Sequence, residues 1–357
     1  EFGSYRTLSP ALVGKPHHES EAKSVLWGKK IQLGIDVGSD SIKVCTLESN
    51  GTSCSVALHP LLPNRSSQEQ RLDGPALSQR LQTLAAELKA KGKSKVHLSL
   101  HAPTTASGYL ELPKLSADQL QVAIPSAVAR EIPHPLQEVN LFTLPVPALT
   151  DVNVQGVFFV AIPKTVQEGQ SQAFSQAGLE VSSGEPGLLA CLRGLTRNLI
   201  LAPEQVTALV VCGYQRTSVV LLKGPHPYFC REFRLAGSDF TYAFQMGDQV
   251  DWPEAERRKR AYDVGEKDFK VESFVQRWLG DVQRSLAFAS QKHSQLTPGK
   301  LILSGGTALW KGLTNRLSEF LSLPVTRHEW DRVKLSSSTG PSEISLYDEA
   351  IGLVCRT

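Results

Sequence analysis

The stretch LGIDVGSDSIKVCTLE, Leu33 to Glu48, is typical of two strands joined by a tight turn of small and polar residues. Successive backbone N–H groups at such a glycine-containing turn can line phosphate groups, and Gly38 permits close approach. Asp36 can hold a magnesium-bound water. By itself the stretch also fits an ordinary hairpin with a polar turn, so it gives a candidate phosphate site.

Several polar residues of this turn could add contacts to a bound phosphate. The serine hydroxyl groups and the lysine ammonium group would donate hydrogen bonds, and an aspartate in the same turn adds a second acid. These candidates are Ser39, Asp40, Ser41 and Lys43.

The composition of the 357 residues is that of an ordinary globular protein, 41% hydrophobic and 20% charged, and leaves room for more than one core. A net charge of +3 gives no basic face for nucleic acid. No apolar run reaches the roughly 18–20 residues that a membrane-spanning helix needs. The six cysteines are scattered without metal-binding spacing and are expected to be reduced. Residues 1–26 are expected to be a cloning scar and a polar leader.

A second run, VTALVVCGYQRTSVVLLKG at Val206 to Gly224, repeats the opening pattern of strand, glycine turn and strand. Two similar halves that each bring a glycine turn toward one cleft are the expected consequence. Aligning the runs places Val211 where the first turn has Asp36, so the second turn lacks an acid. Gly213 and Thr217 remain to offer backbone and hydroxyl contacts.

The other segments complete a two-lobed α/β plan. Ser116 and Gln119 have the spacing of a helix capping box. The buried strand KLILS is followed by Gly305, Gly306 and Thr307. The two glycines have no side chains, so the flat ring of an adenosine could lie against their backbone. The expected divisions are the first lobe at 27–104, an inserted small subdomain at 105–186, a linking helix at 187–200, second-lobe core at 201–250, a helical subdomain at 251–298, second-lobe core again at 299–342, and a C-terminal helix on the first lobe at 343–357.

The order of these motifs resembles the actin, hexokinase and Hsp70 superfamily and, within it, the PilM family of type IV pilus assembly proteins. The resemblance rests on the following stretches: LGIDVGSDSIKV, LPKLSADQL through AREIPHPLQEV, VAIPKTVQE with AGLEV, AGSDFT, AERRK, LSGG and EAIGLVCR. It implies an actin-like two-lobed ATPase fold of duplicated ribonuclease-H-like domains, with an inserted FtsA/PilM-type α+β subdomain. Glu256 and Lys259, in AERRK, resemble the family's helix beside adenine and ribose, although ERRKR also fits a solvated helix face.

The resemblance implies ATP and Mg²⁺ as ligands, with at most slow hydrolysis because Val211 cannot hold magnesium. It also implies a cytoplasmic scaffold that captures the N-terminal tail of a PilN-like inner-membrane protein and meets other pilus or secretion motor components, so that contact with the membrane is indirect. The tail would lie in a groove between the inserted subdomain and the first lobe. Four residues could shape that groove, or could be interior packing and turn residues instead: Leu112, Pro113, Ile132 and Pro133.

Two other classes stay open at this point. An FtsA-type divisome protein would be expected to end in a basic amphipathic helix, whereas this sequence stops at Thr357, directly after an apolar helix. A sugar or acetate kinase would need a catalytic Asp and two intact phosphate turns, and Val211 argues against that class.

Overall fold

A computed structural model of the chain describes residues 6–7, 31–47, 53–60, 74–89, 94–102, 105–151, 153–330, 334–335 and 341–355. Apart from residues 6–7, the expected leader at 1–26 lies outside this part. Among the described residues, no helix combines the length and the apolar character needed to cross a membrane. The six cysteines are free thiols, as expected.

The first sheet is built around the opening hairpin. Its strands are β2 (Ile31–Val37), β3 (Ser41–Leu47), β4 (Ser53–Pro60), β5 (Ser94–Leu100), β9 (Val181–Pro186) and β15 (Lys334–Leu335), in the order β15-β4-β3-β2-β5-β9. The first three strands form an antiparallel meander, whereas β5 and β9 run parallel to β2.

The second sheet has the same plan. Its strands are β10 (Val206–Cys212), β11 (Thr217–Lys223), β12 (His226–Phe233), β13 (Lys300–Ser304) and β14 (Val325–Arg327), in the order β12-β11-β10-β13-β14. Again an antiparallel meander comes first, and two strands parallel to its first strand follow. The internal repeat expected from the two glycine turns is therefore confirmed.

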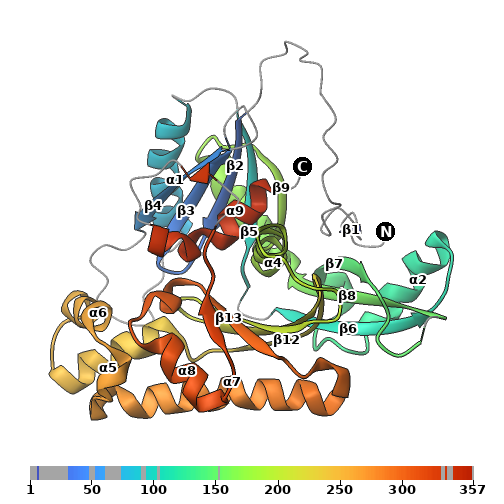
Figure 1. The fold of residues 1–357 in the computed structure, drawn as a ribbon. Coiled ribbons are helices and arrows are strands. Elements are labelled where there is room, and N and C mark those ends of the chain that lie inside the picture. Colours follow the sequence, from blue (N-terminus) through green and yellow to red (C-terminus); the bar gives the residue numbers. More distant parts are fainter. Residues whose placement is uncertain are drawn as a thin grey trace.

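Helices cover both sheets (Figure 1). Those next to the first sheet are α1 (Gly74–Lys89), α3 (Lys164–Gln176), α4 (Gly187–Asn198) and α9 (Asp348–Val354). Those of the second lobe are α5 (Gly237–Asp248), α6 (Trp252–Ala261), α7 (Phe269–Lys292) and α8 (Leu313–Leu321). Short 3-10 helices are η2 (Leu136–Glu138), η3 (Val264–Glu266), η4 (Ser294–Leu296), η5 (Gly306–Leu309) and η6 (Pro341–Tyr347). The long α7 runs beneath the second sheet, where the indole of Trp278 is fully buried.

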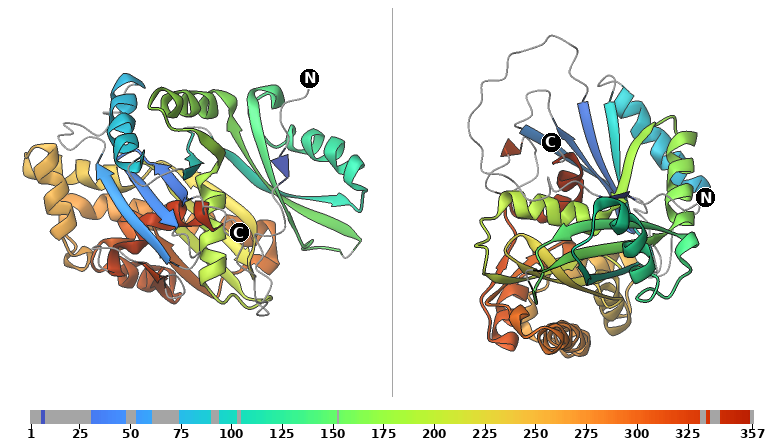
Figure 2. Two further views of the ribbon diagram at one scale, coloured as in Figure 1. Left: turned by 90° about the horizontal axis from the view of Figure 1, so that it is seen from above. Right: turned by 90° about the vertical axis from the view of Figure 1, so that its right-hand side faces the viewer.

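The inserted subdomain projects from the first lobe (Figure 2). It comprises β6 (Ala106–Pro113), α2 (Ala117–Val128), β7 (Val139–Val146) and β8 (Val154–Pro163), and β7 also pairs with β1 (Arg6–Thr7). The sheet order is β1-β7-β8-β6. Helix α2 begins at the expected capping box, in which Ser116 Oγ accepts from the backbone N–H of Gln119 and the Gln119 side chain accepts from the backbone N–H of Ser116.

The expected range of this subdomain, 105–186, extends too far. Strand β9 completes the first sheet beside β5, and α3 packs on α1 and β9. The chain therefore returns to the first lobe after β8. Likewise β15 lies in the range expected for the second lobe but pairs with β4.

Helix α9 is held tightly in the first lobe by two glycines. A Cβ atom on Gly34 of β2 would lie 2.0 Å from the backbone oxygen of Ala350, and one on Gly352 would lie 1.8 Å from the backbone oxygen of Ala190 in α4. Because backbone atoms cannot rotate away as a side chain can, only glycine allows this approach. The position of α9 is therefore fixed against β2 and α4.

Candidate functional site

The two glycine turns face one cavity. A space of about 440 Å³ is lined by both turns, including Gly38 and Lys43 from the first hairpin and Gly213 and Arg216 from the second. Each turn is closed in the same way, since Gly38 N–H donates to Ser41 O at 3.1 Å and Gly213 N–H donates to Arg216 O at 2.9 Å. The repeat thus places two equivalent hairpins on opposite sides of a cleft.

The strand register also fixes which residues correspond. Asp36 pairs with Lys43 across the first hairpin, and Val211 pairs with Ser218 across the second. Val211 is therefore the structural counterpart of Asp36, as the sequence alignment has it. Val211 lines the cavity, so the second turn presents an apolar side chain at the position where the first turn presents a carboxylate.

Asp36 is the most heavily hydrogen-bonded acid of the cleft. Its Oδ2 accepts from Lys43 Nζ at 3.0 Å, and its Oδ1 lies 2.8 Å from both Ser99 Oγ and His101 Nε2. Burial alone would raise the pKa of Asp36, but the charge of Lys43 and the hydrogen bonds from His101 and Ser99 hold it well below its usual range. The carboxylate therefore stays ionised at neutral pH.

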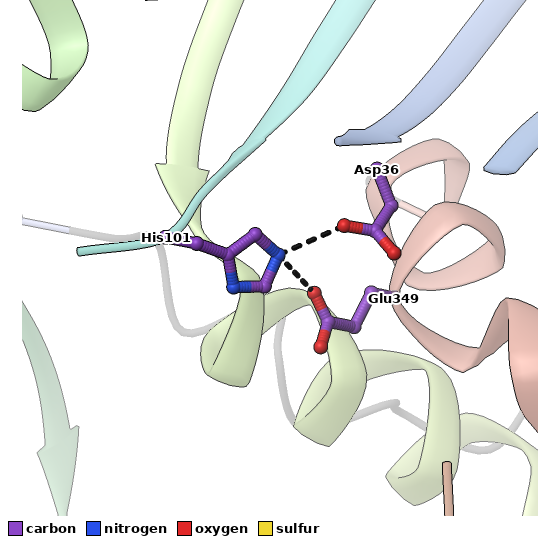
Figure 3. A group of neighbouring side chains, drawn as sticks. All are labelled: Asp36, His101 and Glu349. Carbon is purple, nitrogen blue, oxygen red and sulfur yellow. Dashed lines mark hydrogen bonds and ion pairs between the residues drawn. The ribbon is translucent and has the colours of Figure 1, made fainter. Parts of the chain in front are cut away.

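His101 and Glu349 join Asp36 from other parts of the chain (Figure 3). His101 directly follows β5, Glu349 lies in the first turn of α9, and His101 Nε2 lies 2.9 Å from Glu349 Oε2. Burial alone would lower the pKa of His101, but the charge of Glu349 and the hydrogen bond to Asp36 raise it well above its usual range. The approach requires Gly187, where a Cβ atom would lie 2.2 Å from Glu349 Oε2 and 2.6 Å from His101 Cε1.

The second turn is tied to the rest of its lobe through the carbonyl oxygen of Gly213. This oxygen accepts from Gly237 N–H at 3.1 Å and from Thr307 Oγ1 at 3.3 Å. The ammonium of Lys259 in turn donates to Gly237 O at 3.2 Å and contacts Glu256 Oε2 at 2.7 Å. The structure therefore brings together four residues that the sequence singled out from three separate segments.

Lys259 and Glu256 form an ion pair with each other and make further hydrogen bonds within the second lobe. Burial lowers the pKa of Lys259, although the charge of Glu256 offsets part of that effect. Burial would raise the pKa of Glu256, but the charge and the hydrogen bond of Lys259 lower it. Thr241 Oγ1 also lies 2.6 Å from Glu256 Oε2. This helix is thus an internal support beside the turn, and neither residue lines the cavity.

The glycines after β13 have two different surroundings. Gly305 has φ +86°, and a Cβ atom there would lie 2.5 Å from the backbone oxygen of Cys212, so the turn itself requires glycine. At Gly306 a Cβ atom would meet Leu346 Cδ2 at 3.1 Å. The Leu346 side chain therefore packs against Gly306, beside which we expected a flat ring to lie.

Two of the expected phosphate contacts do not line the cavity in this structure. Thr217 is fully buried, and its hydroxyl donates to Leu235 O at 2.8 Å while accepting from Trp278 Nε1 at 3.0 Å. Successive strand residues face opposite sides, and the counterpart of Lys43 in register is Ser218, one position later. Ser41 is also buried and does not line the cavity.

Sequence reasoning missed Arg216, as it missed His101 and Glu349. Arg216 lines the cavity, and its Nη1 lies 3.4 Å from Glu232 Oε2. With Lys43 it places a positive charge on each side of the cleft, against the acids Asp36 and Asp40 on the first turn. The signal that could have found Arg216 is its place in the repeated turn, between Gly213 and the following strand.

The four residues expected to shape a partner groove differ in their surroundings. Ile132 is buried and Leu112 is half-buried, and both pack in the inserted subdomain's own core around Ile124 and Phe159. Pro113 and Pro133 are exposed. Strand β6, which carries Leu112 and Pro113, is the sheet edge opposite to β7.

Comparison with known proteins gives consistent results. The model of the family described as type IV pilus assembly protein PilM matches residues 34–353. No curated protein sequence matches the chain. Among solved structures, one described as the PilM-PilN type IV pilus biogenesis complex is similar with a TM-score of 0.79 at 25% identity, covering 92% of this chain and 98% of that one.

More distant structures share the fold. MreB5 of Spiroplasma citri bound to ADP has a TM-score of 0.56 at 9% identity, covering 90% of this chain and 94% of that one. The ethanolamine utilization protein EutJ from Carboxydothermus hydrogenoformans has a TM-score of 0.51 at 13% identity, covering 92% and 89%. The predicted actin-like ATPase fold is confirmed.

Proposed function

Since this chain belongs to the family of type IV pilus assembly protein PilM, we propose that it acts on the cytoplasmic side of the inner membrane as an actin-like scaffold that binds ATP between its lobes and docks an extended tail of a PilN-like membrane protein. Family membership favours this role over the divisome and kinase classes. Its association with the membrane would then be indirect, through the partner.

Nucleotide binding is supported by the two matching hairpins that line one cavity, since each supplies a glycine turn and a cation. Lys43 and Arg216 would hold phosphate oxygens, and the Asp36 carboxylate would hold a magnesium-bound water. Magnesium, when bound, would neutralise charge on the phosphates. The structure of MreB5 bound to ADP supports this reading by the shared fold alone.

The same geometry argues against fast hydrolysis. Val211 offers no oxygen to a cation, so only the first turn of the proposed site supplies a carboxylate. On the adenosine side, Leu346 would have to leave Gly306 before a base could lie there. We therefore propose a nucleotide that is bound slowly and turned over slowly, in a structural or regulatory role.

Titration of the full chain with a fluorescent ATP analogue and magnesium tests this proposal. Lys43→Met should weaken binding at least tenfold, roughly the 1.4 kcal/mol or more that a charged contact to phosphate contributes. The matched control is Lys223→Met, because Lys223 pairs with Glu204 and does not line the cavity. Circular dichroism would show that both variants are folded. Equal affinity of Lys43→Met and the unaltered chain, or no binding by either, would contradict nucleotide binding at this site.

For the partner tail we propose the β7 edge of the inserted subdomain instead of the groove predicted from the sequence. The edge already accepts a parallel strand, because Arg6 pairs with Phe142 and Thr7 with Thr143. Addition of an extended segment to a sheet edge is a common mode of peptide recognition, in which main-chain hydrogen bonds supply affinity. The solved PilM-PilN complex supports a PilN-like occupant.

A peptide with the sequence of a PilN-like tail tests this docking site. Removing residues 1–26 should raise its affinity, because β1 would no longer compete for the edge. Methylating every second backbone nitrogen of the peptide should weaken binding when these are the nitrogens that face β7. Methylating the nitrogens in between should leave binding unchanged. Binding that ignores both changes would place the tail elsewhere, and no binding at all would argue against the partner.

A further inference from the structure

We propose that Asp36, His101 and Glu349 form a binding site for a divalent transition-metal ion, of which Zn²⁺ is the best fit. The three residues come from the end of β2, the residue after β5 and the first turn of α9 (Figure 3). One ligand atom from each lies within 4.8 Å of the other two. The site needs no nucleotide, although it shares Asp36 with the proposed nucleotide site in the same cavity.

The number of oxygen atoms around His101 Nε2 is the first argument. Three oxygens lie close to this nitrogen, Asp36 Oδ1 at 2.8 Å, Glu349 Oε2 at 2.9 Å and Ser99 Oγ at 3.2 Å. One imidazole nitrogen carries at most one hydrogen, so it can satisfy only one of them well. A cation between the nitrogen and the two carboxylates would be shared by all three residues.

Glu349 provides the second argument. Its Oε2 is buried and lies 2.9 Å from His101 Nε2, the same nitrogen that Asp36 Oδ1 approaches at 2.8 Å. Two carboxylates that converge on one imidazole nitrogen offer three ligand atoms to a single cation. Gly187 is what allows Glu349 and His101 to converge, because any side chain there would occupy their place. The cluster is thus built into the packing of α4 and α9.

The donor set indicates the class of ion. Imidazole nitrogen with carboxylate oxygen suits zinc and its first-row neighbours, whereas magnesium prefers oxygen alone. Bonds of about 2.0–2.1 Å in a tetrahedral site put ligand atoms roughly 3.3 Å apart, so the two nitrogen–oxygen distances of 2.8 and 2.9 Å would each lengthen by a few tenths of an ångström. The bound ion would replace the proton on Nε2, and its +2 charge would face two carboxylates, one of which keeps its contact with the Lys43 ammonium through Asp36 Oδ2.

The site is also accessible. The side chains of Asp36, His101 and Glu349 are 6%, 39% and 20% exposed, and all three line the cavity between the lobes. A metal ion held by them would leave its fourth position open toward that cavity. Cys191 also lines this cavity but is fully buried, so the test below distinguishes a site with sulfur from one without it.

The test is titration of the full chain, stripped of metal with a chelator, with Co²⁺ as a visible probe and then with Zn²⁺. We expect one equivalent of Co²⁺ with the intense bands of a four- or five-coordinate ion and without a sulfur charge-transfer band. Zn²⁺ should displace it. His101→Ala and Glu349→Gln should each weaken binding at least tenfold, while the control His134→Ala leaves it unchanged.

Three outcomes would overturn the proposal. They are unchanged affinity in both His101→Ala and Glu349→Gln, a sulfur charge-transfer band that reveals cysteine ligation, and no stoichiometric binding by the unaltered chain. If His101→Ala unfolds, the affinities of Glu349→Gln and Gly187→Ala test the proposal instead. Gly187→Ala should weaken metal binding because its Cβ atom would push Glu349 away without removing a ligand. No nucleotide is present in this assay, so its failure would leave the ATP proposal untouched.

Discussion

Replacing Arg193 by methionine should destabilise the first lobe by about 3–5 kcal/mol, the usual cost of removing one partner from a buried ion pair. Arg193 is 4% exposed and its guanidinium binds both carboxylate oxygens of Glu185, which is fully buried. Arg193 Nη1 also donates to the backbone oxygen of Gly352 at 3.0 Å. The substitution would remove the positive charge that neutralises the buried Glu185 carboxylate, together with one hydrogen bond between α4 and α9.

The double variant Glu185→Leu with Arg193→Met separates the lost charge pair from lost packing. It removes both charges, so no unpaired charge remains, and the lost hydrogen bonds, among them the one to Gly352, contribute about 1 kcal/mol each. Glu185→Leu alone should cost about as much as Arg193→Met, because it leaves the guanidinium unpaired. The two single effects therefore sum to far more than the double effect.

Equilibrium urea unfolding, followed by far-ultraviolet circular dichroism, measures these differences. The slope against urea should stay constant across the set, so that the midpoint alone reports stability. A cost below about 1 kcal/mol for Arg193→Met would refute the reasoning, since exposed pairs behave in that way. A double variant as unstable as the sum of the singles would refute it as well.

Three further predictions concern Val211 in the cleft, Thr217 in the core of the second lobe and Gly352 in α9. Val211→Asp restores the acid that the second turn lacks and should raise magnesium-dependent ATP turnover by on the order of tenfold or more, measured as released phosphate; unchanged turnover would show that something else limits hydrolysis. Thr217→Val should lower the free energy of unfolding by about 1–3 kcal/mol with unchanged nucleotide affinity, because its hydroxyl serves Leu235 and Trp278 and not the cavity; reduced affinity would return Thr217 to the site. Gly352→Ala should cost about 1–3 kcal/mol or more in thermal denaturation, since its Cβ would lie 1.8 Å from a backbone oxygen, and a stable variant would show that α9 can shift.

Local chemistry made much of this protein predictable from the sequence. The alternation of apolar residues around a glycine turn is a property of neighbouring positions, so it predicts both hairpins and their likeness. Asp36 and Lys43 are seven residues apart on paired strands, and their contact follows from the register of one hairpin. The missing acid at Val211 follows from the same comparison.

The tertiary structure decided what the hairpins face. His101 and Glu349 meet Asp36 only because β5 lies beside β2 and α9 packs on α4, contacts between segments far apart in sequence. The side of a strand on which a hydroxyl points depends on a one-residue register, which is why Thr217 was assigned to the cleft although it lies in the core. Sequence by itself thus determined the repeated turns and the asymmetry of their acids. Packing between distant elements alone determined which charges gather at the first turn, because no pattern of neighbouring residues encodes that proximity.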